Sequence, residues 1–214
     1  ALAAFHVWAS ALRLPVNEDA CRQAFARAFI PGRMQKVEGA PGLPPRLILD
    51  GGHNAHGLAA LKASLEAEGI RPAAVLFACL RDKPLAEMLP LVLGIAALGQ
   101  AVAGQAAEGK SAEWQAVAGQ AAVGEAGPAQ APALLFAVGI STCPRALAPQ
   151  ELAEMLGPAA TPQADIHAAL EQVRAVPGPV LVCGALDLLG EFSTQHPWLQ
   201  EREQSPSAPG GPRP

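Results

Sequence analysis

The segment covering residues 46–57 constrains the fold of this chain more than any other stretch. It reads Arg-Leu-Ile-Leu-Asp-Gly-Gly-His-Asn-Ala-His-Gly, an apolar run that ends in a carboxylate and is followed by two glycines. This pattern predicts a buried strand that ends at Asp50, a tight glycine turn, and a helix capped by Asn54. Ligands of open α/β sheets bind beyond the carboxyl ends of the strands, so Asp50 and His53 are candidates for contacting a polar, anionic ligand. A plain strand–turn–helix connection with a solvated histidine is the alternative.

The rest of the chain continues the alternation of strands and helices. Apolar runs predict further strands over residues 73–79, 133–138 and 180–183, and helices over residues 84–93, 149–156, 161–176 and 185–192. Strands that alternate with helices are typical of a parallel sheet covered on both faces. The predicted fold is therefore α/β, a Rossmann-like, mostly parallel sheet with helices on both faces.

The first 30 residues differ from this pattern. Residues 1–14 are an apolar helical stretch, and Asn17 is expected to cap a second helix that has Glu18 and Asp19 in its first turn. Pro31 is expected to stop that second helix.

Residues 94–132 contain an internal repeat and predict a low-complexity surface insertion. The sequence Gln-Ala-Val-Ala-Gly-Gln-Ala-Ala occurs at residues 100–107 and again at 115–122. Residues 104–111 also match the phosphate-binding P-loop pattern, with Lys110 as its lysine. A P-loop needs a buried strand directly before it, and this segment has none, so we interpret the match as accidental. A small P-loop protein that uses this segment remains the alternative. The Pro-, Gly- and Ser-rich residues 201–214 are expected to be disordered.

Charge and composition exclude several classes of protein. The net charge of −4 argues against a general nucleic-acid binder or a membrane-surface binder. No apolar run reaches the roughly 20 residues of a membrane helix, and no secretion signal is recognisable. Four widely spaced cysteines predict reduced thiols in a cytoplasmic protein. None of them has a recognisable base beside it, which argues against a catalytic cysteine. His53 and His56 could share a metal, but no third ligand of suitable spacing is visible, so no metal site is predicted.

Four motifs together point to a known family. Residues 31–35, Pro-Gly-Arg-Met-Gln, followed by Leu-Ile-Leu-Asp-Gly-Gly-His-Asn-Ala-His, resemble the folylpolyglutamate synthase and dihydrofolate synthase family of the Mur ligase superfamily. The usual family form has Ala where this chain has Gly52 and Pro where it has Ala55. Residues 81–83, Arg-Asp-Lys, are similar to the family's Asp-Lys-Asp segment. Residues 180–191 are similar to its closing Gly-Ser-Leu-Tyr-Leu-Val-Gly-Glu segment.

The resemblance implies a domain organisation. Residues 31–200 would form a C-terminal glutamate-ligase domain of the Mur ligase type, and residues 1–30 would be the tail of a preceding domain and a linker helix. The chain would then be part of a longer polypeptide whose N-terminal ATPase domain is its partner, and alone it would be inactive. A stand-alone nucleotide- or partner-binding module without catalysis is the alternative.

The resemblance also implies a chemistry and roles for single residues. Such ligases use ATP and Mg²⁺ to join L-glutamate to dihydropteroate or folate through an acyl phosphate, within folate biosynthesis and one-carbon metabolism. Arg33 would stabilise the transferring phosphate as a catalytic and ATP-binding residue, while Asp50 would bind the ribose hydroxyls and His53 would close the same pocket. Lys83 is a candidate for substrate binding, and the metal ligands are expected in the N-terminal domain. The family's Ser-Leu-Tyr is Ala185-Leu-Asp187 here, which puts its substrate contacts in doubt.

Overall fold

The computed structural model describes residues 2–99 and 133–200. The chain divides into two compact units, Ala1–Pro31 and Gly32–Pro214. Each unit is described separately below.

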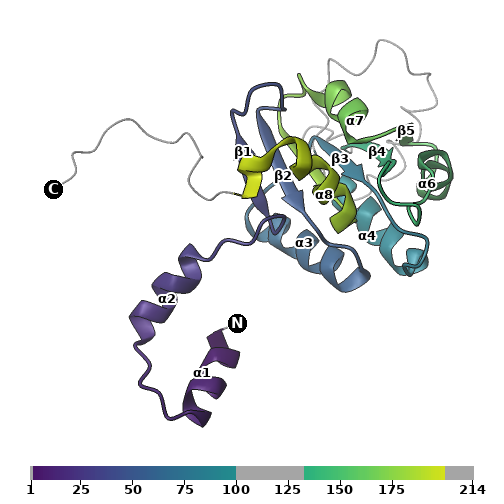
Figure 1. The fold of residues 1–214 in the computed structure, drawn as a ribbon. Coiled ribbons are helices and arrows are strands. Elements are labelled where there is room, and N and C mark those ends of the chain that lie inside the picture. Colours follow the sequence, from purple (N-terminus) through teal and green to yellow (C-terminus); the bar gives the residue numbers. More distant parts are fainter. Residues whose placement is uncertain (1, 100–132, 201–214) are drawn as a thin grey trace, which may run out of the picture. The chain divides into compact units, whose positions relative to one another are not determined.

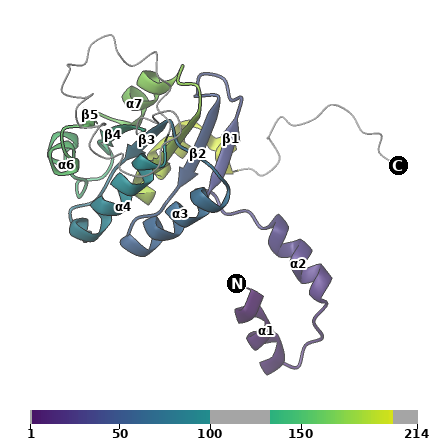
Figure 2. The ribbon, with the colours of Figure 1, turned by 180° about the vertical axis from the view of Figure 1, so that it is seen from behind.

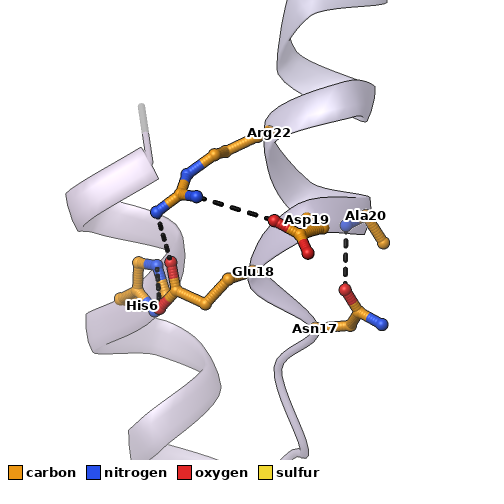
Figure 3. A network of polar contacts seen from close by, with 6 residues as sticks. All are labelled: His6, Asn17, Glu18, Asp19, Ala20 and Arg22. Carbon is orange, nitrogen blue, oxygen red and sulfur yellow. Dashed lines mark hydrogen bonds and ion pairs between the residues drawn. The ribbon is translucent and has the colours of Figure 1, made fainter.

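The first unit consists of α1 (Leu2–Ala11) and α2 (Glu18–Arg27). The Asn17 side chain accepts a hydrogen bond of 2.9 Å from the amide of Ala20, which confirms the predicted cap. Glu18 lies 3.6 Å from both His6 and Arg22, and Arg22 lies 3.6 Å from Asp19 (Figure 3). These contacts lie largely in solvent, so each adds little to stability.

The second unit is built around one sheet. Its described strands are β1 (Gln35–Glu38), β2 (Arg46–Asp50), β3 (Ala74–Phe77), β4 (Leu134–Val138), β5 (Ala160–Gln163) and β6 (Pro179–Cys183). Their order across the sheet is β1-β2-β6-β3-β4-β5, and all neighbours are parallel except β1, which is antiparallel to β2 (Figure 1). This topology confirms the predicted α/β class and mostly parallel sheet.

Helices cover both faces of this sheet (Figures 1 and 2). One face is covered by α3 (Ala55–Ala67), α4 (Leu85–Ala97) and α6 (Pro149–Leu156), and the other by α7 (Ile166–Val173), α8 (Leu186–Gln195) and the 3-10 helix η1 (Pro197–Gln200). The central strands are buried on both sides, which explains their continuous apolar sequences, such as Val-Leu-Val-Cys in β6.

The carboxyl ends of β2 and β6 form one of the places where the chain leaves neighbouring strands toward opposite faces; β6 with β3 and β4 with β5 are the others. Strands β2 and β6 are neighbours, and Asp50 is in register with Cys183 at their carboxyl ends. The chain leaves β2 toward α3 on one face and leaves β6 toward α8 on the other. Adjacent strands whose helices go to opposite faces form a topological switch point, the place where open α/β sheets bind ligands.

Two predicted elements need correction. Residues 161–165 do not begin a helix: β5 occupies Ala160–Gln163, and α7 begins after Asp165, whose carboxylate accepts a 2.8 Å hydrogen bond from the Ala168 amide. The stretch after the Pro-Gly-Arg sequence, for which no strand was predicted, contains β1. Both missed strands lie at the edges of the sheet.

Helix α4 continues to Ala97, past the predicted end at Leu93, so its last turn lies in the stretch assigned to the insertion. The two repeat copies, the P-loop-like segment and the C-terminal tail lie outside the described residues. None of the described helices combines the length and the apolar character that crossing a membrane requires.

Candidate functional site

The Pro-Gly-Arg sequence forms a turn that packs against the glycine turn after β2. Gly32 and Met34 both have left-handed backbone conformations, with φ of 67° and 44°, and Arg33 lies between them. The carbonyl of Gly32 accepts a hydrogen bond of 2.7 Å from the amide of Gly51. A left-handed non-glycine residue such as Met34 persists only where its surroundings hold it, so this turn is strongly constrained.

Asp50 joins the two turns. Its side chain is only 6% exposed, and its two oxygens accept hydrogen bonds from the amide of Met34 at 2.9 Å and the amide of Gly52 at 2.8 Å. The carboxylate predicted at the end of the strand is therefore present, and it has a structural role that the sequence did not reveal. An ionised carboxylate offers about four acceptor positions, and these two bonds use two of them.

Arg33 is exposed, and among the described residues its guanidinium makes no hydrogen bond or ion pair. It lies directly over the glycine turn, since a Cβ atom on Gly51 would be 3.4 Å from its Nη1 and would overlap the side chain of Leu186. A side chain at position 51 would therefore displace the exposed Leu186 side chain and touch the guanidinium. An unpaired guanidinium held by a rigid turn is suited to binding a phosphate or a carboxylate.

His53 is half-buried, and its Nδ1 lies 2.9 Å from the carbonyl oxygen of Gly51. Because a carbonyl can only accept, we assign the proton to Nδ1, which leaves Nε2 of the neutral ring as an acceptor. The Asn54 side chain accepts from the Gly57 amide at 2.8 Å, which confirms the predicted cap of α3. The amides of Ala55 and His56 have no acceptor within the described residues. Such amides at a helix start attract anions.

Lys83 belongs to a different cluster. It follows β3, which β6 separates from β2, and its Nζ lies 3.7 Å from a carboxylate oxygen of Asp82. The same oxygen lies 3.4 Å from Arg145. Arg33, Asp50 and His53 therefore surround one glycine turn, whereas the described contacts do not join Lys83 to them.

The start of α8 forms the other side of the switch point. Ala185 occupies the N-cap position, and no side chain caps the helix there. Leu186 is 47% exposed and covers Gly51. Asp187 is half-buried and makes no hydrogen bond or ion pair with the described residues. Relative to the family pattern, this edge has lost a hydroxyl and gained a carboxylate.

The residues around the glycine turn do not fit a magnesium ion. Magnesium prefers several oxygen ligands in octahedral geometry, but Asp50 is buried and its oxygens are bonded to amides. Within residues 2–99 and 133–200, no group of three or more His, Cys, Asp or Glu side chains could hold a metal ion.

Two cysteines lie at or near the carboxyl ends of central strands but do not fit a nucleophilic role. Cys79 and Cys183 are free and buried, and burial raises the pKa of the Cys79 thiol to about 11. Burial, with a smaller contribution from Asp50, also raises the pKa of Cys183 well above its usual range. Both therefore remain protonated near neutral pH, whereas a nucleophilic cysteine needs a thiolate.

Sequence reasoning missed one side chain of this site, Gln35. It is 9% exposed, and its amide bonds both to Gly32 in the Pro-Gly-Arg turn and to Leu199 near the C-terminus. The available signal was its alternation with Val37, which places both residues on the buried side of β1. The alternation could not reveal the distant partner.

The sequence matches no protein-family model and no curated protein. The structure, however, is similar to solved folate ligases. A bifunctional folylpolyglutamate synthase/dihydrofolate synthase from Yersinia pestis CO92 aligns with a TM-score of 0.57 and 22% identity, over 86% of this chain and 35% of that protein. E. coli FolC in complex with DHPP and ADP aligns with a TM-score of 0.57 and 22% identity, over 87% of this chain and 36% of that protein.

A Mycobacterium tuberculosis folylpolyglutamate synthase complexed with ADP and AMPPCP gives a TM-score of 0.58 and 16% identity, over 87% of this chain and 37% of that protein. At these identities the likeness shows the fold, and at that level it confirms the resemblance that the motifs predicted. The chain spans about 36% of the length of the structures it matches.

Proposed function

We propose that this chain is the C-terminal domain of an ATP-dependent ligase that adds L-glutamate to dihydropteroate or folates. The observation that carries the proposal is the unpaired Arg33 held over the glycine turn of β2, beside His53 and the free amides of α3. These cationic and donor groups meet at the switch point between β2 and β6, and the fold is shared with folate ligases.

In this proposal the site binds the nucleotide through the positive charge of Arg33 and through hydrogen-bond donors. Arg33 contacts the terminal phosphate of ATP, and the amides at the start of α3 contribute further donors. The free acceptor positions of Asp50 receive the ribose hydroxyls. His53 closes the pocket with its Nε2 acceptor, because its Nδ1 is bonded to Gly51.

The reaction consists of two transfers. A carboxylate oxygen of the folate or dihydropteroate attacks the terminal phosphorus of ATP, and the bond to ADP breaks. The glutamate amine then attacks the carbonyl carbon of the acyl phosphate, the bond to phosphate breaks, and the amine releases a proton. Arg33 lowers the barrier of the first transfer by neutralising charge on the phosphoryl oxygens.

Two further parts of the proposed reaction are the magnesium ligands, which lie outside this chain, and the contacts of the substrate carboxylate. The domain is inactive without the N-terminal ATPase domain, which supplies the ligands of the Mg²⁺ that shields the phosphate charge, and the whole enzyme is cytoplasmic. Lys83 is 26% exposed, so its ammonium is available to a substrate carboxylate. Asp187 would repel such a carboxylate if it came close to α8.

Titration of the ¹⁵N-labelled chain with Mg²⁺-ATP, followed by the amide signals of residues 51–57 in NMR spectra, tests this proposal. We expect saturable shifts there, and we expect Arg33→Met to weaken ATP binding by about tenfold because one charged contact is lost. Arg46→Met is the matched control, because Arg46 is an exposed arginine at the amino end of β2, the opposite end of that strand from the glycine turn. It should bind ATP like the unmodified chain.

The same spectra discriminate the alternative sites. Shifts centred on residues 104–111 that disappear in Lys110→Ala, with residues 51–57 unaffected, would contradict the proposal and support a P-loop. Equal weakening by Arg33→Met and Arg46→Met would show that only overall charge matters and would also contradict it.

A further inference from the structure

We propose that Gln35 is a positioning residue that sets the place of Arg33 by tying its turn to the C-terminal 3-10 helix η1. The inference rests on the proposed function, because it assigns Arg33 to phosphate binding. It adds a part of the chain, residues 197–200, that lies far from the site in sequence and contributes no side chain to it.

The geometry of Gln35 supports this role. Its Oε1 accepts a hydrogen bond of 2.9 Å from the amide of Gly32, and its Nε2 donates one of 2.7 Å to the carbonyl of Leu199. Both bonds are buried, so water does not replace them when they are lost. Gln35 thus uses both ends of its amide, one on the Arg33 turn and one on η1.

The turn itself leaves little freedom once these bonds are made. It is fixed by Gln35 at the Gly32 amide, by Gly51 at the Gly32 carbonyl, and by Asp50 at the Met34 amide. Helix α8 closes the remaining side, since a Cβ on Gly32 would lie 2.7 Å from the Leu189 side chain. Removing the Gln35 contacts frees the Gly32 amide and leaves the turn with the two bonds toward β2, so it loses one of its three anchors.

The residue that accepts the hydrogen bond from Gln35 near the C-terminus, Leu199, is well packed. Leu199 is 2% exposed and belongs to the same buried cluster as Val37 of β1 and Phe192 of α8. The ring of Phe192 also stacks near His196, with centroids 4.5 Å apart, directly before η1. The Leu199 carbonyl is therefore a fixed support for the Gln35 side chain.

This arrangement predicts an effect on phosphate recognition. The turn carries Arg33, so loosening it should weaken the contact with the terminal phosphate and leave the contacts with the nucleoside intact. We expect Gln35→Met, which has a similar volume but no amide, to weaken Mg²⁺-ATP binding by roughly five- to tenfold. Binding of AMP, which lacks the terminal phosphate, should change less than about twofold. Gln35→Glu keeps the acceptor for Gly32 but turns a buried carboxylate oxygen toward the Leu199 carbonyl, so it should weaken ATP binding at least as much as Gln35→Met.

The experiment is an NMR titration of the full chain and its variants with Mg²⁺-ATP and with AMP, together with urea unfolding. Val173→Ala, a core substitution on α7, is the matched control because it destabilises the fold without touching the Arg33 turn. The positioning role predicts that the ratio of AMP to ATP dissociation constants falls in Gln35→Met but not in Val173→Ala. It also predicts that Gln35→Met has no further effect when Arg33 is already replaced by Met.

Three results would overturn the inference, and they differ from one another. Equal weakening of ATP and AMP by Gln35→Met would show a structural role only. Unchanged ATP affinity in Gln35→Met, with Arg33→Met still weakening it, would reject the positioning role and leave the proposed site intact. Failure of the unmodified chain to bind ATP at residues 51–57 would reject the proposed site and this inference together.

Discussion

Gly184→Ala is expected to remove at least about 4 kcal/mol of the free energy of unfolding, a large part of what a domain of this size has. Gly184 follows β6 and has a φ of 105°, a backbone conformation that residues with a Cβ rarely adopt. A Cβ there would overlap the backbone carbonyl of Ala78 and the buried ring of Phe77. Neither group can move away, because the Ala78 amide donates a hydrogen bond to the carbonyl of Cys183 and Phe77 is fully buried.

Urea unfolding followed by circular dichroism measures this effect, and Gly190→Ala is the matched control. Gly190 lies on α8 with nothing within 4 Å of an added Cβ. The control should therefore gain up to about 1 kcal/mol, because alanine favours the helix over glycine. Similar unfolding midpoints for the two variants would contradict the packing described at the end of β6.

Asp50→Ala is expected to lower the free energy of unfolding by about 3 kcal/mol. The substitution leaves the part-buried amide of Met34 and the buried amide of Gly52 without acceptors, and hydrogen bonds to charged groups contribute about 1.5–3 kcal/mol each. The free energy of unfolding of Asp50→Asn should lie between those of Asp50→Ala and the unmodified chain. Its side-chain amide keeps one acceptor but turns a donor toward the second backbone amide.

Asp165→Ala provides the comparison for Asp50→Ala in the same urea experiment. Asp165 accepts a single amide hydrogen bond as the N-cap of α7, so its loss should lower the free energy of unfolding by only about 1 kcal/mol. If Asp50→Ala and Asp165→Ala lower the free energy of unfolding by amounts that agree within about 0.5 kcal/mol, Asp50 does not join the two turns as the structure indicates.

The central part of the sheet could be predicted from the sequence because it is buried on both faces. The strands β2, β3, β4 and β6 have short apolar sequences, and such runs have few other stable arrangements. The caps of α2 and α3 were predictable for a local reason, since Asn17 and Asn54 bond to amides three residues away.

The edge strands could not be predicted in this way. The sequence of β1, Gln-Lys-Val-Glu, alternates between buried and exposed positions over only four residues. The sequence of β5, Ala-Thr-Pro-Gln, contains a proline and has no fully buried residue. Pro162 is tolerated because an edge strand needs hydrogen bonds on one side only. Propensity therefore favoured a helix start at residue 161, and pairing with β4 decided otherwise.

The site shows the same division between local and long-range information. The grouping of Asp50 and His53 follows from one strand–turn–helix segment, and the motif placed Arg33 near them. The roles of Gln35 and Asp50 as links between turns depend on contacts with residues far away in sequence, Leu199 and Met34. Spacing alone could also not reveal that β6 separates Lys83 from this group.

Glutamate-dependent release of ADP from Mg²⁺-ATP, measured with dihydropteroate or a reduced folate, tests the ligase assignment most directly. The assignment predicts no release by this chain alone. It predicts release when the chain is joined to the N-terminal part of E. coli FolC, 36% of which aligns with this chain, and a loss of at least about 100-fold when that fusion carries Arg33→Ala. Glutamate-dependent release by the chain alone, or a fusion equally active with Arg33→Ala, would contradict the assignment.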